Sequence, residues 1–228
     1  TRRAAPRTRR TEVMSLGAKV IGILGAGRVG TAIARRALAA GYEVRIASSR
    51  PPAEIALVLQ FVAPGAVAAT ADEVVAASDI IVLALPLSKY RSLDPKALAG
   101  KIVVDAMNYW APTDGILPEF EGAPSSSEVV ADYLAGARLL RSFNHMGYHE
   151  IDGEARPAGD PERRAMALAG DDAQARAVLA GVIDRLGFDP VDAGPLAAAR
   201  DFAIGTPVFG APLRREELQA ALGAPLAA

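Results

Sequence analysis

Three glycines stand in a spacing that suits the binding of a phosphate group: Gly25, Gly27 and Gly30 form G-x-G-x-x-G directly after the apolar run 19–24. Gly25 permits a tight turn out of a strand, Gly27 lets backbone N–H groups approach an anion, and Gly30 lets a following helix pack closely on the sheet. Such a helix directs its N-terminal dipole and its free N–H groups at the anion. We therefore predict a site for the pyrophosphate of a dinucleotide. It comprises Gly25, Ala26, Gly27, Arg28, Val29 and Gly30.

The residues around the glycines support this interpretation. A β-branched run precedes the motif, a helical pattern covers 31–40, and Gly41 ends that helix before a second expected strand at 43–47. A glycine-punctuated turn without a ligand is the alternative. The order of strand, glycine loop, helix and strand favours a dinucleotide-binding βαβ unit.

Three polar residues, Ser48, Ser49 and Arg50, follow the second expected strand. A chain that binds NAD usually carries Asp or Glu here, about 20 residues past the glycines, to accept hydrogen bonds from the ribose hydroxyls. Two hydroxyl groups and a guanidinium suit a 2′-phosphate instead, because Arg offers a planar fork to a dianion and no carboxylate repels it. The triplet therefore predicts NADP(H) as the cofactor. The alternative is a solvated loop in which Arg50 only precedes the break at 51–52.

The rest of the chain keeps an alternation of strands and helices. Further strands are expected at 66–70, 79–85, 101–105, 138–143, 165–169 and 188–192, and further helices at 53–62, 72–77, 92–98, 127–134, 172–186, 196–202 and 214–222. The strand at 79–85 is almost wholly apolar, as is typical of a central parallel strand buried on both faces. We predict an α/β fold: a Rossmann-type, doubly wound, mostly parallel sheet of about eight strands with a small C-terminal lid.

We expect three regions along the chain: a basic arm at 1–17, an NADP-binding Rossmann domain at 18–195 and a small helical segment at 196–228. The first 13 residues hold five arginines and one acidic residue, although the whole chain has a net charge of −1. Such an arm could touch nucleic acid or a membrane surface, or serve targeting. We expect it to be disordered and of little functional weight, since Met14 resembles a natural start. The acidic remainder argues against a nucleic-acid partner.

Composition excludes several classes of site. The chain has no cysteine, which excludes disulfides, Cys-ligated zinc, iron–sulfur clusters and a thiol nucleophile. Its two histidines, His145 and His149, are too few for a convincing metal site, so no metal is expected. There is no uncharged apolar run long enough to span a membrane, and we expect a cytoplasmic protein.

The ends of the expected strands are the other candidate positions, because ligands in open α/β sheets bind beyond the carboxyl ends of the strands. The strand at 79–85 leads into Leu85 and Pro86, which should lie over the cofactor. The strand at 101–105 leads into the segment 106–110, which we place next to the nicotinamide.

Taken together, the motifs resemble the NADPH-dependent F-420 reductase family over roughly residues 18–205. That family is similar in turn to the cytosolic oxidoreductase domain of the six-transmembrane metalloreductases. The late D-A-G-P-L element discriminates better than the glycines, which many enzymes share. The residues that carry the resemblance are G-A-G-R-V-G at 25–30, Ser49-Arg50, Leu85-Pro86, D-A-M-N at 105–108, Ser142-Phe143-Asn144, and 187–196 with Ala199-Arg200.

The resemblance implies hydride transfer between NADPH and a deazaflavin (coenzyme F-420) or a flavin-like acceptor, with the two rings stacked over the central strand ends. In such chemistry the protein contributes mainly positioning, so no catalytic triad is required. Met107 and Asn108 are then expected on the carboxamide side of the nicotinamide, and Leu85 and Pro86 along the path from adenosine to nicotinamide. Substrate binding is expected at Asn144, His145 and Met146, which should flank the acceptor ring.

No residue is a certain catalytic group. Asn144 and His145 are the candidates near the acceptor, and His145 could give it a proton or a hydrogen bond; a hydrogen-bonded loop histidine is the alternative. Tyr109 and Trp110 could offer a stacking face or simply pack in a lid. Asp105 is expected to fix its loop rather than to act as a base.

Two other functions stay open. One is an NADPH-dependent reductase of a small imine, ketone or flavin, and the other is a non-catalytic NADP(H) sensor. The proline-containing segment 110–127 is expected to be a variable loop on the acceptor side. The apolar segment 202–212 is expected to close the pocket or to pair with a second subunit, and by analogy with related folds we expect a homodimer.

Overall fold

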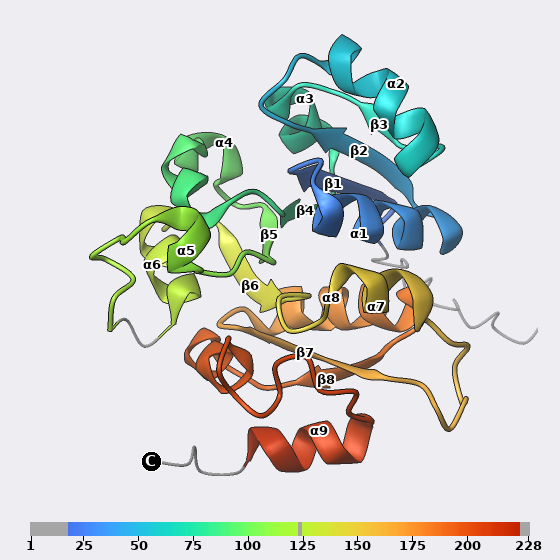
Figure 1. Cartoon of the computed structure of the whole chain (residues 1–228), viewed down its shortest axis with the longest axis vertical. Helices are drawn as coiled ribbons and strands as arrows, with labels where there is room; N and C mark the ends of the chain where they lie inside the picture. Colours follow the sequence, from blue (N-terminus) through green and yellow to red (C-terminus); the bar gives the residue numbers. More distant parts are fainter. Residues whose placement is uncertain (1–17, 123–124, 224–228) are drawn as a thin grey trace, which may run out of the picture.

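The computed structural model describes residues 18–122 and 125–223, so the expected arm at 1–17 lies outside the described residues. Its centre is an eight-stranded sheet with the order β3-β2-β1-β4-β5-β6-β7-β8 (Figure 1). The strands are β1 (Val20–Leu24), β2 (Glu43–Ala47), β3 (Val67–Ala68), β4 (Ile80–Leu83), β5 (Ile102–Asp105), β6 (Arg138–Ser142), β7 (Ala165–Gly170) and β8 (Asp189–Asp192).

The strands do not all run in the same direction. Neighbours from β3 to β6 pair in parallel, β7 pairs with β6 antiparallel, and β8 follows β7 in parallel. The predicted mostly parallel, doubly wound sheet is therefore confirmed. Because of the reversal, the carboxyl ends of β1 to β6 share one edge of the sheet, whereas those of β7 and β8 lie at the opposite edge.

Helices cover both faces of this sheet. One core cluster includes residues of α1, α2, α7 and α8, and a second includes residues of α3, α4, α6 and the 3-10 helix η1. The helices are α1 (Arg28–Ala39), α2 (Pro52–Val62), α3 (Ala71–Ala77), η1 (Leu87–Ser92), α4 (Pro95–Leu98), α5 (Ala111–Asp114), α6 (Ser126–Tyr133), α7 (Tyr148–Gly153), α8 (Ala173–Leu186), η2 (Leu196–Phe202, 3-10) and α9 (Arg215–Leu222).

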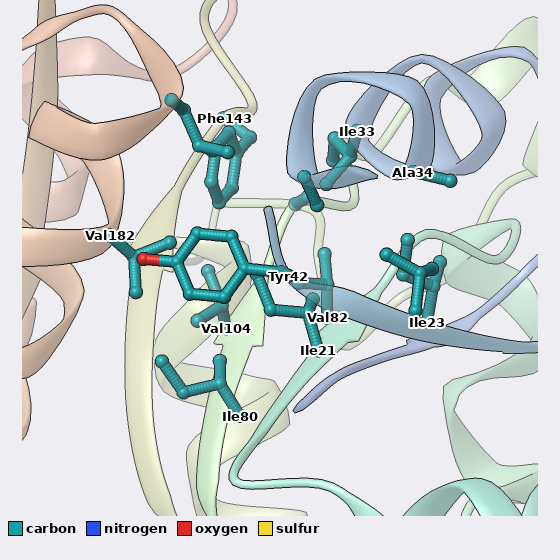
Figure 2. Packing of buried hydrophobic residues seen from close by; sticks show 14 of the residues in the cluster. Ile21, Ile23, Ile33, Ala34, Tyr42, Ile80, Val82, Val104, Phe143 and Val182 are labelled. Atoms are coloured by element: carbon teal, nitrogen blue, oxygen red, sulfur yellow. The ribbon is translucent and has the colours of Figure 1, made fainter. Parts of the chain in front are cut away.

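The core is built mainly from aliphatic side chains, as the composition predicts. Ile21 and Ile23 of β1 lie on one face of the sheet together with Val82 of β4, and Ile33 of α1 packs over them (Figure 2). Alternate residues of the same strands, such as Ile81, belong to the second cluster on the other face. Burial on both faces explains why these strands are continuous apolar runs.

Helices η2 and α9, which follow residue 195, pack on β7 and β8. Ala167 of β7 and Val191 of β8 form a third cluster with Phe202 of η2 and Leu218 of α9. The intervening residues of β7, Met166 and Leu168, belong to the first cluster. The segment η2 thus starts near the edge where β8 ends and returns along the sheet toward the carboxyl edge of β6.

Some expected helices differ from the observed ones. The helix expected at 92–98 is shortened to α4 and is preceded by η1, which ends at Ser92. Pro95 disfavours a helical conformation in the residue before it, and Asp94 caps α4 by accepting a hydrogen bond from the Lys96 N–H at 2.8 Å. The helix expected at 196–202 is a 3-10 helix. The short helices α5 and α7 were not expected from the sequence, and α5 lies in the segment interpreted as a loop.

Candidate functional site

The glycine loop joins β1 to α1 at the carboxyl edge of the sheet. Gly25 has φ +125°, and an added Cβ there would clash with the carbonyl oxygen of Ala84; a Cβ at Gly30 would clash with the carbonyl oxygen of Gly25. A Cβ at Gly27 would meet nothing within 4 Å. The first and third glycines are therefore required by packing, whereas the middle one lines open space at the N-terminus of α1. This geometry fits a pyrophosphate.

The polar triplet lies beside that loop, because β1 and β2 pair in parallel with Leu24 opposite Ala47. The hydroxyl of Ser48 accepts a hydrogen bond from the Arg50 N–H at 3.0 Å, which closes a tight turn. The side chains of Ser49 and Arg50 are exposed. One hydroxyl thus holds the turn, while the other hydroxyl and the guanidinium face solvent.

The end of β4 completes the cofactor side of the edge. The N–H of Ala84 donates to the Leu24 carbonyl at 2.8 Å, which continues the pairing of β4 with β1 into the glycine loop. Beyond it, Leu85 is partly buried and Pro86 is exposed. Both residues therefore lie where the sequence places them, beyond the carboxyl end of a central strand.

A buried ion pair follows at the end of β5. Asp105 is fully buried and lies 2.9 Å from the guanidinium of Arg141, which is 2% exposed. The second carboxylate oxygen, Oδ1, accepts from the Met107 N–H at 2.9 Å, and Oδ2 also accepts from the Ser127 hydroxyl at 2.7 Å. These contacts occupy both oxygens. Asp105 therefore fixes its loop, in agreement with the sequence-based expectation.

Arg141 is a site residue that sequence reasoning missed. Its guanidinium also donates to the carbonyl of Met107 and, at 2.8 Å, to Oδ1 of Asn108. The Asn108 amide in turn donates to the carbonyl of Asn144 at 2.7 Å. Burial lowers the pKa of Arg141 from its ordinary value, and the charge of Asp105 opposes that shift. The exits of β5 and β6 are thereby tied together.

The three residues expected to flank the acceptor are buried. Asn144 is 3% exposed and its amide donates to the carbonyl of Phe202 at 2.9 Å, His145 is 3% exposed, and Met146 is 5% exposed. The preceding residue, Phe143, has φ 66°, a left-handed conformation that is uncommon for a bulky residue. This turn directs the following side chains inward. In the described structure these side chains face the interior, and their contact with an acceptor ring stays a prediction.

His145 is held as a neutral imidazole. Its Nε2 accepts from the N–H of Ala167 in β7 at 3.1 Å, and its ring meets that of Phe202 edge-on at 5.3 Å between centroids. Burial, with the positive charges of Arg141 and Arg164, lowers the pKa of His145 to about 3. His145 thus makes the contacts of the hydrogen-bonded loop histidine that the sequence left as the alternative, and its role toward an acceptor stays a prediction.

The aromatic pair after β5 divides into two roles. Tyr109 stacks on Phe120 at 5.4 Å between centroids, and its hydroxyl donates to Glu121 at 2.6 Å, so it packs within the segment 110–127. The side chain of Trp110 is 53% exposed. Trp110 alone therefore offers an open ring face at the exit of β5.

The glycine loop has an aromatic neighbour that the sequence did not predict. Tyr148, the first residue of α7, lies beneath the guanidinium of Arg28 at 5.6 Å from the ring centroid, and its hydroxyl is 3.4 Å from Arg28 Nη1. His149 packs on Tyr148 at 3.9 Å between centroids. The start of α7 therefore borders the open side of the glycine loop. No sequence motif points to this pair.

Comparison with known proteins agrees with this geometry. Residues 20–109 match the family described as NADP oxidoreductase, coenzyme F420-dependent. A candidate F420-dependent NADP-reductase from Arthrobacter sp. FB24 superposes with a TM-score of 0.68 and 27% identity, covering 81% of this chain and 88% of that one. The hypothetical protein SMa0349 from Sinorhizobium meliloti has a TM-score of 0.73 and 28% identity over 86% of this chain and 95% of its own.

A curated relative is the metalloreductase STEAP3 of Rattus norvegicus, 28% identical over 184 residues. The match covers 79% of this chain but spans only about a third (35%) of STEAP3. Among the residues that the structure describes, no helix has the length and apolar character needed to cross a bilayer. The resemblance to the F420-dependent reductases is confirmed, and two of the relatives named here, the Arthrobacter protein and STEAP3, are described as reductases.

Proposed function

We propose that this protein transfers a hydride between NADP(H) and a deazaflavin (coenzyme F420) or a flavin-like acceptor. One observation carries the proposal most directly. A glycine loop with an open middle position stands next to an exposed serine and arginine at the ends of two adjacent parallel strands. An NADP molecule has its pyrophosphate and its 2′-phosphate in this relation.

Different residues would bind different parts of the cofactor. The N–H groups of the segment 25–30 would hold the pyrophosphate, and Ser49 and Arg50 would bind the 2′-phosphate, which a guanidinium recognises with a planar pair of donors. Asn108 would meet the carboxamide of the nicotinamide. The bound cofactor supplies the hydride, and the chain's own contribution is to hold the ring in place and to limit its contact with water.

The proposal also names the hydride acceptor. It is supported by the family description and by the name of the Arthrobacter relative, both of which refer to F420. The exposed ring of Trp110 at the exit of β5 offers a stacking face for a planar acceptor. His145 is buried and its Nε2 accepts from the Ala167 N–H, so the proton that accompanies the hydride in reduction of a deazaflavin would come from a source other than this imidazole.

The test has two stages on the purified full chain. Calorimetric titration with NADPH and with NADH should show tighter binding of NADPH. Oxidation of NADPH is then followed with oxidised F420, FMN, a small ketone and a cyclic imine as separate acceptors. Turnover with F420 or with FMN, but not with the ketone or the imine, supports the proposal. Turnover only with the ketone or imine indicates the alternative small-acceptor reductase, and tight NADPH binding without any turnover indicates a sensor.

A further inference from the structure

Two charged residues lie buried within the central sheet. Asp105 and Arg141 stand opposite each other on the parallel strands β5 and β6, both at the carboxyl edge and both almost fully buried. Central parallel strands are normally apolar. A buried ion pair often stabilises a protein no more than an apolar pair of similar volume would, because both ions lose their hydration. Stability alone therefore gives a weak reason for this pair.

The contacts of Arg141 point to another role. All hydrogen bonds that the Arg141 side chain makes within the described residues go to the segment 105–108. They reach the carboxylate of Asp105, the carbonyl of Met107 and Oδ1 of Asn108. Its Nε has no partner in the part of the chain that the structure describes. The guanidinium is thus directed at the exit of β5 rather than at its own strand.

The contact with Asn108 fixes the orientation of an amide. Arg can only donate hydrogen bonds, so the oxygen of the Asn108 amide must face Arg141 and the nitrogen must face the Asn144 carbonyl, 2.7 Å away. A side-chain amide has two donor positions and two acceptor positions. Within the described residues, one donor position and one acceptor position of the Asn108 amide have no partner, and the residue is partly buried. A ligand carboxamide needs this complement of one donor and one acceptor.

We propose that Arg141 is a positioning residue that orients Asn108 toward the nicotinamide carboxamide. This inference rests on the proposed function, because it assumes that the nicotinamide lies at the exit of β5. Arg141 itself touches no ligand. Its effect on the cofactor passes through the Asn108 amide and through the link to Asn144 at the exit of β6.

The test compares two ligands and avoids the unknown acceptor. NADPH carries the nicotinamide, whereas 2′-phospho-ADP-ribose carries the same phosphates without it. The double variant Asp105→Leu with Arg141→Met replaces the ion pair by an apolar pair and leaves no unpaired buried charge. It should weaken NADPH binding by about tenfold, as expected for loss of one or two hydrogen bonds, and leave 2′-phospho-ADP-ribose within about twofold.

Two further variants separate positioning from folding. Asn108→Ala should reproduce the same selective loss, and combining it with the double variant should add nothing, because both changes act through one amide. Arg163→Met is the matched control: Arg163 is 4% exposed and paired with Asp184 at 2.8 Å, but none of its ion pairs reaches 105–108. It should lower the melting temperature and leave the ratio of the two affinities unchanged.

The outcomes are distinct. If the double variant keeps wild-type NADPH affinity, or loses both ligands equally, the inference is overturned. If the double variant does not fold, Asn108→Ala alone decides, and its unchanged preference for NADPH over the fragment would overturn the inference. Equal affinity of the wild-type chain for NADPH and for 2′-phospho-ADP-ribose would also overturn the inference. Failure of the wild-type chain to bind either ligand would instead refute the proposed function, and the inference with it.

Discussion

Acidification should destabilise the folded protein through His145. Its imidazole is buried, accepts a hydrogen bond from the Ala167 N–H and faces the positive charges of Arg141 and Arg164. The folded-state pKa is about 3, against 6.5 for an ordinary histidine. As the pH falls below 6.5 the unfolded chain takes up a proton that the folded chain refuses. The stability due to neutral His145 is thus fully present above pH 6.5 and is lost between pH 6.5 and about 3.

The size of this effect follows from the pKa difference. Within the window the unfolding equilibrium constant rises about tenfold for each pH unit, and over the full window the loss is about 5 kcal/mol at most. Urea unfolding of the wild-type chain and of His145→Gln at pH 7.5, 6.5, 5.5 and 4.5 would measure it. The Gln side chain can still accept from Ala167 but cannot titrate, and the carboxylates act equally in both proteins. The variant should therefore lose stability less steeply below pH 6.5.

An equal pH dependence of the two proteins would refute this reasoning. It would show that the imidazole of His145 is hydrated or charged in the folded state. The same variant also tests the role of His145 in the reaction. Because the buried imidazole already accepts from the Ala167 N–H, we expect the dependence of turnover on pH to be the same in wild type and in His145→Gln at pH values where both are folded.

Three further predictions concern the cofactor loop and assembly. Arg50→Ala should weaken NADPH binding by about 1.5–3 kcal/mol, the range for a charged hydrogen bond, and leave NADH nearly unchanged in calorimetry; equal weakening of both would show that Arg50 does not bind the 2′-phosphate. Gly30→Ala drives a Cβ into the Gly25 carbonyl and should lower the melting temperature, whereas Gly27→Ala meets nothing within 4 Å and should melt like wild type but bind NADPH less tightly. Identical melting of the two variants would contradict this assignment. Light scattering should give twice the 23.6 kDa of one chain for the expected homodimer, and a mass near 23.6 kDa would exclude it.

Much of the fold follows from local patterns in the sequence. The glycine spacing, the apolar runs and the helix signals together predict the alternation of strands and helices, because each depends on a few neighbouring residues. The reversal of β7 is not local. The chain leaves β6 and enters β7 at the same edge of the sheet, with α7 packed beside α1 between the two strands, and nothing in the segment 148–164 indicates that path.

The parts of the site that depend on backbone geometry were predictable from the sequence. The parts that depend on the direction of a side chain were less so. Gly25 and Gly30 are required by contacts that the motif itself implies. The inward direction of His145 depends on the left-handed turn at Phe143, which a bulky residue does not signal. In the sequence, nothing next to Arg141 distinguishes it from a charged residue on the surface. The available clue was its place near the end of an expected strand, matching that of Asp105 on the strand before it.

The central claim is hydride transfer from NADPH to a deazaflavin, and one spectrophotometric experiment tests it most directly. The purified chain is mixed with oxidised F420 and either NADPH or NADH, and the deazaflavin absorbance is followed. The account predicts rapid bleaching that depends on the protein and on NADPH, with NADH much less effective. No bleaching with NADPH, under conditions where calorimetry shows that NADPH is bound, would contradict it.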